Sequence, residues 1–303
     1  MMSTPPNPSP AQGPPDRYAV LGHPVAHSQS PFIHAEFARQ TGQRMSYGRL
    51  ACPLDGFEAT LRDFIATADP SQGLGPVHGC NITVPFKFQV LPLARSVSPR
   101  AQLAQAGNTL RLDPTGWLAD NTDGVGLVRD ITQHAATSLA GRRLLLIGAG
   151  GAAAGALGPL MAAGCASVTV ANRTLARARA LIQRHTAWAE EHGVALHATG
   201  LDDCGEAFDV VINSSASSLA GAPSPVAART LAPGSLAVDL MYGPSARPFM
   251  QWAQTQGAVA RDGLGMLVEQ AAESFLFWRG VMPDTAPVLA ALRQRLASPH
   301  DPC

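Results

Sequence analysis

The chain has 303 residues, of which 46% are hydrophobic and 15% are charged, which predicts a globular protein of about two domains. Its 22 basic and 22 acidic side chains balance, so there is no long-range positive field and nucleic acid is not an expected partner. The five widely spaced cysteines lack zinc-type spacing and indicate free thiols in a reducing cytoplasm, where we expect the protein to be located.

Two segments bear on targeting. Residues 1–16 are rich in proline and have neither a basic start nor an apolar stretch, so we expect a disordered tail and no signal peptide. No charged residue occurs between Arg143 and Arg173, but six glycines and Pro159 interrupt this run. A membrane-spanning helix needs about 20 mainly apolar residues, so we expect a buried strand, turn, helix and strand here and no membrane partner.

The first half alternates short apolar runs with helix start signals. The helix that follows Ser98-Pro99 is expected to end at Gly107, which places Asn108 just beyond a rigid element. Asp113-Pro114-Thr115-Gly116 is typical of a hairpin turn. In chain order, the pattern predicts a strand over 18–21, a helix over 30–37, a strand over 79–85, a helix over 98–107, and paired strands over 109–112 and 117–119.

From Arg142 onward the pattern becomes a regular alternation of strand and helix, which predicts a parallel sheet covered on both faces. The last third contains apolar residues from Leu264 to Leu276 at spacings of three and four, which predicts a helix with one apolar stripe. The expected elements are strands over 144–147, 168–171, 210–213 and 236–240 and helices over 152–163 and 174–192.

A glycine motif lies between the first strand and helix of this alternating region. Gly148-Ala149-Gly150-Gly151-Ala152-Ala153 fits the Gly-x-Gly-x-x-Ala pattern of a dinucleotide site. Gly148 permits the tight turn, Gly150 lets a pyrophosphate approach the backbone, and Ala153 lets the helix pack closely. The alternative is an ordinary tight turn, but the βαβ context favours a nucleotide on the helix N-terminus.

The end of the next strand indicates which dinucleotide is bound. Asn172-Arg173-Thr174 stands where an NAD-binding protein usually has an acidic residue for the ribose hydroxyls. The guanidinium of Arg173 matches a 2′-phosphate, and Arg177 lies one helical turn later. For Arg177 and Arg179 a solvated helix face is an equally good interpretation. The sequence therefore predicts NADP.

Lys87 is the only lysine in the chain, and the other 21 basic residues are arginine. An arginine does not exchange a proton near neutral pH, whereas a lysine among apolar neighbours such as Pro85 and Phe88 can do so. The alternative is that Lys87 is an ordinary solvent-exposed residue. Because Lys87 is the only lysine and directly follows a strand, an acid/base role is favoured.

Other polar residues have both a structural and a functional interpretation. Asp123 fits the N-cap of a helix over 125–133, and it also fits a carboxylate that orients a substrate hydroxyl and stabilises the lysine. Ser28 and Ser30 fit a loop and a helix cap, or donors to a substrate carboxylate.

The histidines of the same segment, His23, His27 and His34, raise the question of a metal. Pro24 and Pro31 break any regular face between them, so we expect no metal site.

Taken in order, several motifs resemble the shikimate dehydrogenase family, and the match covers nearly everything after the tail. They are Gly22 to Pro31, Asn81 to Lys87, Gly107-Asn108-Thr109, Asp120 to Gly124, the Gly148 turn, Asn172-Arg173-Thr174, Asp239 to Tyr242, Asp262 to Leu267 and Gln270-Ala271-Ala272.

The resemblance implies NADPH-dependent, reversible reduction of 3-dehydroshikimate to shikimate, a step in aromatic amino acid biosynthesis. It implies an α/β fold with two domains and a cleft between them. The substrate domain, residues 17–122, is discontinuous and is completed by residues 263–303, and residues 123–262 form a Rossmann-type, doubly wound NADP-binding domain.

The resemblance also implies roles for individual residues of this chain. Lys87 and Asp123 form the catalytic pair. The substrate, shikimate or 3-dehydroshikimate, is held by Ser28, Ser30, Asn81, Thr83, Asn108, Tyr242 and Gln270. NADP is held by Gly148, Ala149, Gly150, Gly151, Ala152, Ala153, Asn172, Arg173, Thr174, Arg177, Met241 and Gly263.

Two alternatives remain open at this point. A quinate or quinate/shikimate dehydrogenase has the same reacting centre and uses NAD or NADP. A non-catalytic NADP-binding regulator needs only the nucleotide turn, not Lys87, Asp123 and the serines together. The chain is expected to be a monomer or a homodimer.

Overall fold

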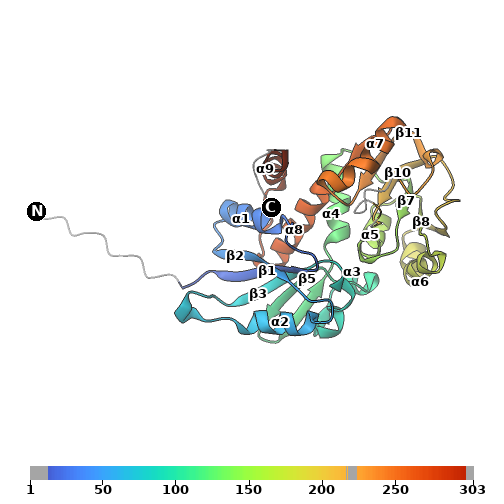
Figure 1. Ribbon diagram of the computed structural model, residues 1–303. Coiled ribbons are helices and arrows are strands. Elements are labelled where there is room, and N and C mark those ends of the chain that lie inside the picture. Colours follow the sequence, from blue (N-terminus) through green and yellow to red (C-terminus); the bar gives the residue numbers. More distant parts are fainter. Residues whose placement is uncertain (1–12, 216, 218–223, 298–303) are drawn as a thin grey trace, which may run out of the picture.

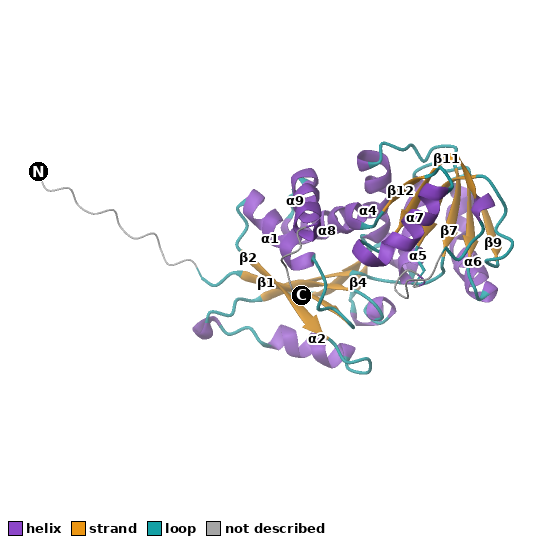
Figure 2. Ribbon diagram, turned by 45° about the horizontal axis from the view of Figure 1, so that its top comes forward, coloured by secondary structure: helices purple, strands orange, loops and turns teal. Residues whose placement is uncertain are grey.

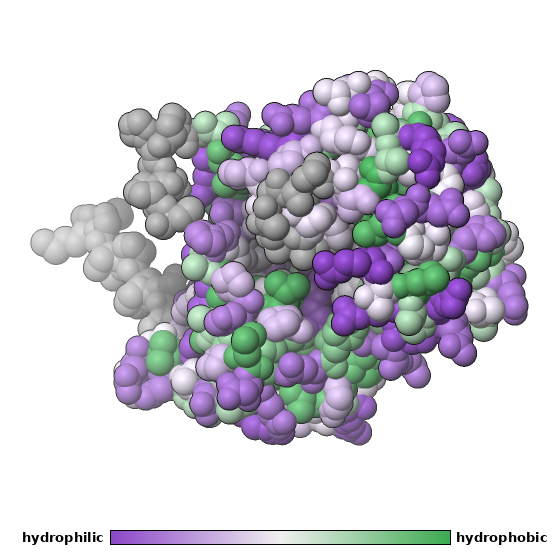
Figure 3. All heavy atoms as spheres, turned by 45° about the vertical axis from the view of Figure 1, so that its right-hand side comes forward, coloured by the Kyte–Doolittle hydropathy of each residue, from purple (hydrophilic) through white to green (hydrophobic). Residues whose placement is uncertain are grey.

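The structure is a computed structural model that describes residues 13–215, 217 and 224–297. Within these residues the chain forms two six-stranded sheets, one in each half of the molecule (Figure 1). The surface is hollowed where the two halves meet (Figure 3). This arrangement confirms the prediction of an α/β fold with two halves and a cleft between them.

The first sheet is mixed and has the strand order β2-β1-β3-β5-β6-β4. β1 pairs in parallel with β2 and β3, whereas β5 pairs antiparallel with both β3 and β6. The strands are β1 (Asp16–Gly22), β2 (Met45–Ala51), β3 (Val77–Ile82), β4 (Ser96–Val97), β5 (Thr109–Asp113) and β6 (Gly116–Asp120).

The second sheet is parallel throughout and has the order β12-β11-β10-β7-β8-β9. Numbered from β7, this is the 3-2-1-4-5-6 order of a Rossmann fold, whose ligands bind at the carboxyl ends of the strands. The strands are β7 (Arg143–Ile147), β8 (Ser167–Ala171), β9 (Ala195–Thr199), β10 (Phe208–Asn213), β11 (Leu231–Asp239) and β12 (Val259–Arg261).

Helices cover both faces of the second sheet (Figure 2), so its central strands β7, β8 and β10 are buried on both sides. Leu144 and Leu146 of β7 face the core beneath α5 and α6, and Leu145 and Ile147 face the core beneath α7. The helices are α1 (Ser30–Thr41), α2 (Phe57–Ala66), α3 (Pro99–Ala104), α4 (Asp123–Arg129), α5 (Gly151–Ala162), α6 (Leu175–Glu191), α7 (Arg247–Thr255), α8 (Leu264–Arg279) and α9 (Thr285–Ala297).

Helices α4 and α8 lie side by side between the two sheets (Figure 1). Two glycines of α4 allow this close approach. A Cβ at Gly124 would lie 2.3 Å from the carbonyl oxygen of Gly155 in α5, and one at Gly126 would lie 2.6 Å from the backbone nitrogen of Gln270 in α8. Side chains at these positions would push the helices apart, so the glycines bring the residues at the N-terminus of α4 close to Gln270.

The last helices return to the first sheet, as the resemblance implied. Trp278 near the end of α8 donates its indole N–H to the carbonyl oxygen of Leu110 in β5 at 3.0 Å. Phe275 of α8 packs with Phe37 of α1 and Leu292 of α9 in one buried cluster. Residues from the end of the chain therefore complete the core of its first half.

The structure corrects three details of the prediction. Helix α3 ends at Ala104, with Gln105 rather than Gly107 in the left-handed conformation at its end. Helix α4 begins at Asp123, so Thr122 and not Asp123 occupies the N-cap position. Asp16 belongs to β1 and pairs with Met45, so it is not part of a tail; residues 1–12 of the expected tail lie outside the described residues.

Candidate active site

Lys87 lies in a short 3-10 turn, Phe86–Phe88, just after β3. The turn is anchored by Phe86, which is fully buried and stacks on Phe57 of α2 with ring centroids 5.1 Å apart. The carbonyl oxygen of Lys87 accepts the N–H of Gly107 at 2.8 Å. Only 13% of the Lys87 side chain is exposed, so the ammonium group is directed into the protein rather than into bulk solvent.

Asp123 is the acidic partner of this lysine. Its Oδ2 lies 2.5 Å from Lys87 Nζ, and its side chain is 6% exposed. Asp123 is the first residue of α4, where a carboxylate is favoured by the helix dipole. Its side chain does not cap the helix but contacts Lys87 and Asn108. The structure therefore contradicts the N-cap interpretation and agrees with a carboxylate that stabilises the lysine.

Asn108 holds the other carboxylate oxygen of Asp123. Its Nδ2, which has two N–H donors, lies within hydrogen-bond distance of Asp123 Oδ1 (2.8 Å), Thr122 Oγ1 (2.9 Å) and Gln270 Oε1 (3.2 Å). Its Oδ1 accepts the backbone N–H of Thr122 at 2.8 Å. Because Asn108 is 2% exposed, these hydrogen bonds fix its amide and, through it, the orientation of Asp123.

Ser28 lies in the loop that enters α1, and Ser30 is the first residue of that helix. Ser28 Oγ donates to Ser30 Oγ at 3.1 Å, and the backbone N–H of Ser30 donates to Ser28 Oγ at 3.3 Å. Tyr242 comes from the other half of the chain and is close to this loop. Burial raises the pKa of the Tyr242 phenol, and the positive charge of Arg49 and a backbone hydrogen bond from Gln29 oppose the shift.

Asn81 lies near the end of β3, and Thr83 is the first residue after that strand. Asn81 is 5% exposed, and its Nδ2 donates to Ser274 Oγ and Thr109 Oγ1, both at 3.0 Å. The backbone N–H of Thr83 donates to the carbonyl oxygen of Leu21 at 2.9 Å. A Cβ at Gly22 would lie 2.3 Å from Thr83 Cγ2, so glycine is required there for Thr83 to adopt its position.

The glycine turn connects β7 to α5 and lies against the lysine. Gly148 has a φ of +107°, a conformation that favours glycine. A Cβ at Gly151 would lie 3.6 Å from both Cβ and Cδ of Lys87, in ordinary contact. Among the residues that the structure describes, no side chain caps the N-terminus of α5, which leaves its first N–H groups available to an anion. Ala153 is fully buried beneath the helix, and Ala149 and Ala152 complete the turn.

The residues predicted to bind the 2′-phosphate of NADP follow the carboxyl end of β8. Asn172 Nδ2 donates to the carbonyl oxygen of Thr174 at 2.9 Å, which shapes the turn into α6. Arg173 and Arg177 are exposed, and neither has an ion-pair partner within the part of the chain that the structure describes. Their guanidinium groups are therefore available to an anionic ligand.

Met241 and Gly263 lie at the carboxyl end of the same sheet. The N–H of Gly263 donates to the carbonyl oxygen of Met241 at 2.8 Å, and a Cβ at Gly263 would lie 2.4 Å from the carbonyl oxygen of Leu240. These contacts tie the start of α8 to the end of β11.

Sequence reasoning missed three residues of this region. Thr122 lies within the Asp120–Gly124 motif, but its hydrogen bond with Gln270 depends on α8, which is distant in sequence. Tyr47, whose hydroxyl donates to Asn81 Oδ1 at 2.7 Å, and Arg49 lie on β2, which was not predicted. Their alternation at positions i and i+2 is the signal that could have placed both on one face.

The structure has no group of three or more His, Cys, Asp or Glu side chains that could hold a metal ion among its described residues. His34, one of the three early histidines, is instead fully buried and stacks on Tyr47 with ring centroids 4.3 Å apart. Within the same part of the chain no helix is both long and apolar enough to cross a bilayer.

Three family models match successive parts of the chain. The shikimate dehydrogenase substrate binding domain matches residues 20–110, the shikimate/quinate 5-dehydrogenase model matches residues 130–235, and the shikimate 5′-dehydrogenase C-terminal domain matches residues 263–293. The first and third models lie on either side of the second, in agreement with the return of α8 and α9 to the first sheet.

Individual proteins agree with these models. A shikimate dehydrogenase (NADP(+)) of Methylibium petroleiphilum is 63% identical over 278 residues, which cover 92% of this chain and 94% of the relative. Among solved structures, an Ael1 enzyme from Pseudomonas putida is 40% identical with a TM-score of 0.79, covering 94% of this chain and all of its own. Shikimate 5-dehydrogenase of Thermus thermophilus, in complex with NADP(H) and shikimate, is 32% identical with a TM-score of 0.73, covering 92% of this chain and 99% of its own. The chain therefore belongs to the shikimate dehydrogenase family.

Proposed function

We propose that this protein catalyses the reversible reduction of 3-dehydroshikimate to shikimate with NADPH. The observation that carries the proposal is the Lys87–Asp123 pair, 2.5 Å apart, whose lysine packs against Gly151 of the nucleotide turn. An acid/base group beside a dinucleotide turn is what a carbonyl reduction requires. The relatives named shikimate dehydrogenase (NADP(+)) support the choice of substrate and cofactor.

The residues of the second sheet fit NADP. The left-handed Gly148 and the uncapped N-terminus of α5 form a turn that suits a pyrophosphate. Arg173, with Arg177 one helical turn later, supplies a guanidinium for the 2′-phosphate, and Asn172 and Thr174 shape the turn between them. Met241 and Gly263 complete the side of the site that faces the first sheet. When bound, NADPH supplies the hydride.

The chemistry of the protein is carried by Lys87. Its ammonium group donates a hydrogen bond to the substrate carbonyl oxygen and gives up a proton as that oxygen becomes an alkoxide. Asp123 holds the ammonium in place and orients the neighbouring substrate hydroxyl. Asn108 keeps Asp123 oriented, because it occupies the carboxylate oxygen that does not face the lysine.

The remaining polar residues hold the substrate. Ser28 and Ser30 donate hydrogen bonds to its carboxylate, with Tyr242 closing this end of the site. Asn81, Thr83 and Gln270 surround its hydroxyl groups. All of these side chains except Tyr242 and Gln270 come from the first half of the chain, so closing the two halves on the substrate also excludes water.

Replacement of the lysine tests the proposal. In Lys87→Met, kcat for NADP-dependent oxidation of shikimate is expected to fall by about 100-fold or more, since acid/base groups contribute about 10²–10⁴-fold. NADPH binding, followed by its fluorescence, is expected to stay within about twofold because Lys87 does not hold the nucleotide. Lys87→Arg serves as the matched control, since it keeps the charge but cannot exchange the proton. A near-normal kcat in Lys87→Met would overturn the proposed mechanism.

The alternatives are separated by a panel of initial rates. Shikimate and quinate are each offered with NADP and with NAD, and absorbance of the reduced nicotinamide is followed. A rate with shikimate and NADP that exceeds the other three supports the proposal, and a higher rate with quinate would assign a quinate dehydrogenase. Absence of any reaction while NADP still binds would favour a regulator.

The proposal also covers the cellular location and the oligomeric state of the protein. We expect a cytoplasmic enzyme, because the four described cysteines are all free and buried. We expect it to act as a monomer or a homodimer, which light scattering of the purified protein would decide.

A further inference from the structure

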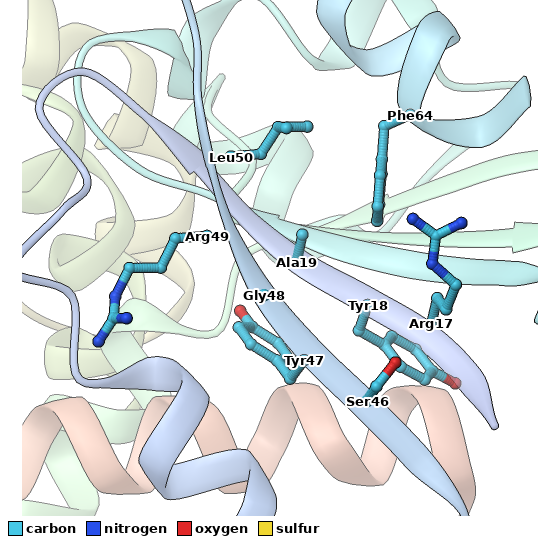
Figure 4. Close-up of a pocket in the computed structure, with 9 residues that line it drawn as sticks. All are labelled: Arg17, Tyr18, Ala19, Ser46, Tyr47, Gly48, Arg49, Leu50 and Phe64. Carbon is cyan, nitrogen blue, oxygen red and sulfur yellow. The ribbon is translucent and has the colours of Figure 1, made fainter. Parts of the chain in front are cut away.

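Arg49 lies on the edge strand β2 and faces the loop that carries the two serines. Its Nε donates to the backbone carbonyl oxygen of Ser28 at 2.8 Å. Its charge also acts on the phenol of Tyr242, which contacts the same loop at Gln29. Figure 4 shows the Arg49 side chain on the same side of β2 as Tyr47 and directed away from Leu50 and Phe64. The guanidinium is therefore held at Ser28 and lies close enough to Tyr242 for its charge to act on the phenol.

Within the described ranges, no acidic side chain pairs with the positive charge of Arg49. Two exposed arginines, Arg39 and Arg62, pair with acids on their own helices, Glu36 and Glu58. Arg49 has no carboxylate within 4.0 Å in the described part of the chain, and its only hydrogen bond there uses Nε. Asp123, the acidic residue of the active site, is already paired with Lys87. Among the described residues, Arg49 thus contributes a cation without an acidic partner at the backbone of Ser28, whose hydroxyl bonds to that of Ser30.

We propose that Arg49 is a specificity-determining residue that makes the site select an anionic substituent on the substrate ring. The inference rests on the proposed function, in which Ser28 and Ser30 hold the substrate carboxylate. Hydroxyl groups donate to neutral and charged oxygen atoms alike, so the serines alone discriminate weakly between an acid and its ester. A nearby guanidinium favours the acid by charge, because charge-assisted contacts are stronger than neutral ones.

The experiment compares the acid with its neutral ester. kcat/KM for NADP-dependent oxidation is measured for shikimate and for methyl shikimate, and the quantity of interest is the acid-to-ester ratio. Arg49→Gln is expected to lower this ratio by about tenfold, mainly through a higher KM for shikimate. Arg39→Gln removes the same charge from an exposed position on α1 and is expected to leave the ratio unchanged.

A purely structural role gives a different result. If Arg49 only supported the Ser28 loop through Nε, Arg49→Gln would impair both substrates equally and the ratio would stay constant, which would overturn the inference. Arg49→Lys keeps the charge but changes the hydrogen bond, so it is expected to retain the ratio within about threefold.

A salt titration gives an independent readout. KM of the unsubstituted protein for shikimate is expected to rise with ionic strength more steeply than that of Arg49→Gln. Equal salt dependence in the two proteins would contradict a role for the charge.

The two proposals fail in different ways. If the unsubstituted protein does not oxidise shikimate with NADP, the proposed function is wrong. If it does so but the acid-to-ester ratio ignores Arg49, only the specificity role is wrong.

Discussion

The guanidinium of Arg173 lies at the carboxyl end of β8, exposed and without an ion-pair partner in the described residues. Because a guanidinium binds a phosphate through two parallel hydrogen bonds, Arg173→Ser is expected to raise KM for NADP by about tenfold or more and to leave KM for NAD nearly unchanged. Initial rates with both cofactors measure this, and Arg179→Ser on the exposed side of α6 is the control. Equal changes for the two cofactors would argue against the 2′-phosphate role.

His34 makes stability depend on pH. Burial lowers the pKa of this histidine to about 3, whereas its ordinary value is 6.5. Below pH 6.5 the unfolded chain binds a proton that the folded protein does not, so stability is full above pH 6.5 and is lost as pH falls toward 3. The loss amounts to about 1.4 kcal/mol per pH unit.

The free energy of unfolding in urea tests this. Between pH 7.5 and pH 5 the unsubstituted protein is expected to lose about 2 kcal/mol more than His34→Phe, which keeps an aromatic ring beside Tyr47. Identical pH dependence in the two proteins would show that His34 titrates normally in the folded state.

For individual residues, the sequence was informative where a residue type was rare. Lys87 was singled out because it is the only lysine, and the structure buries its ammonium group beside Asp123. Tyr47 and Arg49 carried no such signal, because one tyrosine and one arginine in a polar segment are unremarkable. The catalytic, substrate and cofactor roles assigned to individual residues stay predictions.

Helix α4 depends on close contact with its neighbours. A Cβ at Gly126 would lie 2.6 Å from the backbone nitrogen and 2.9 Å from Cα of Gln270, so α8 would have to move. Gly126→Ala is therefore expected to cost about 1–3 kcal/mol of stability, although alanine is the better helix former. Urea denaturation measures the loss. Gly200→Ala, where a Cβ meets nothing within 4 Å, is the control and is expected to be neutral.

Gly126→Ala is also expected to lower activity, because a displaced Gln270 no longer meets Asn108 and Thr122 as it does now. A variant as stable and as active as the original protein would show that the two helices separate easily.

The elements that the sequence did not predict lie mostly at the edges of the sheets. β2 and β9 are edge strands in which exposed side chains alternate with partly buried ones, so neither has a continuous apolar run. α2 buries only Phe57 and Leu61 and begins without a side-chain cap, which weakens its helix signal. In contrast, β7, β8 and β10 are buried on both faces and were predicted within two residues of their bounds.

The arrangement of the whole molecule depends on contacts that local patterns do not contain. The apolar stripe of α8 predicted a helix but not its partners, which are α4 at one end and the first sheet at the other. Its return to the first sheet came only from the family resemblance. The α/β fold with a Rossmann half is confirmed, whereas the domain limits 17–122 with 263–303, and 123–262, stay a prediction.

The solitary lysine has a practical consequence for the molecule as a whole. An endoprotease that cleaves after lysine has one peptide bond to attack in the entire polypeptide, between Lys87 and Phe88. That bond lies in the 3-10 turn after β3, against Gly151 of the nucleotide turn, so cleavage into two fragments reports on the opening of this one site. The rate of that one cut, with and without bound ligands, is a label-free measure of how often the interior is exposed.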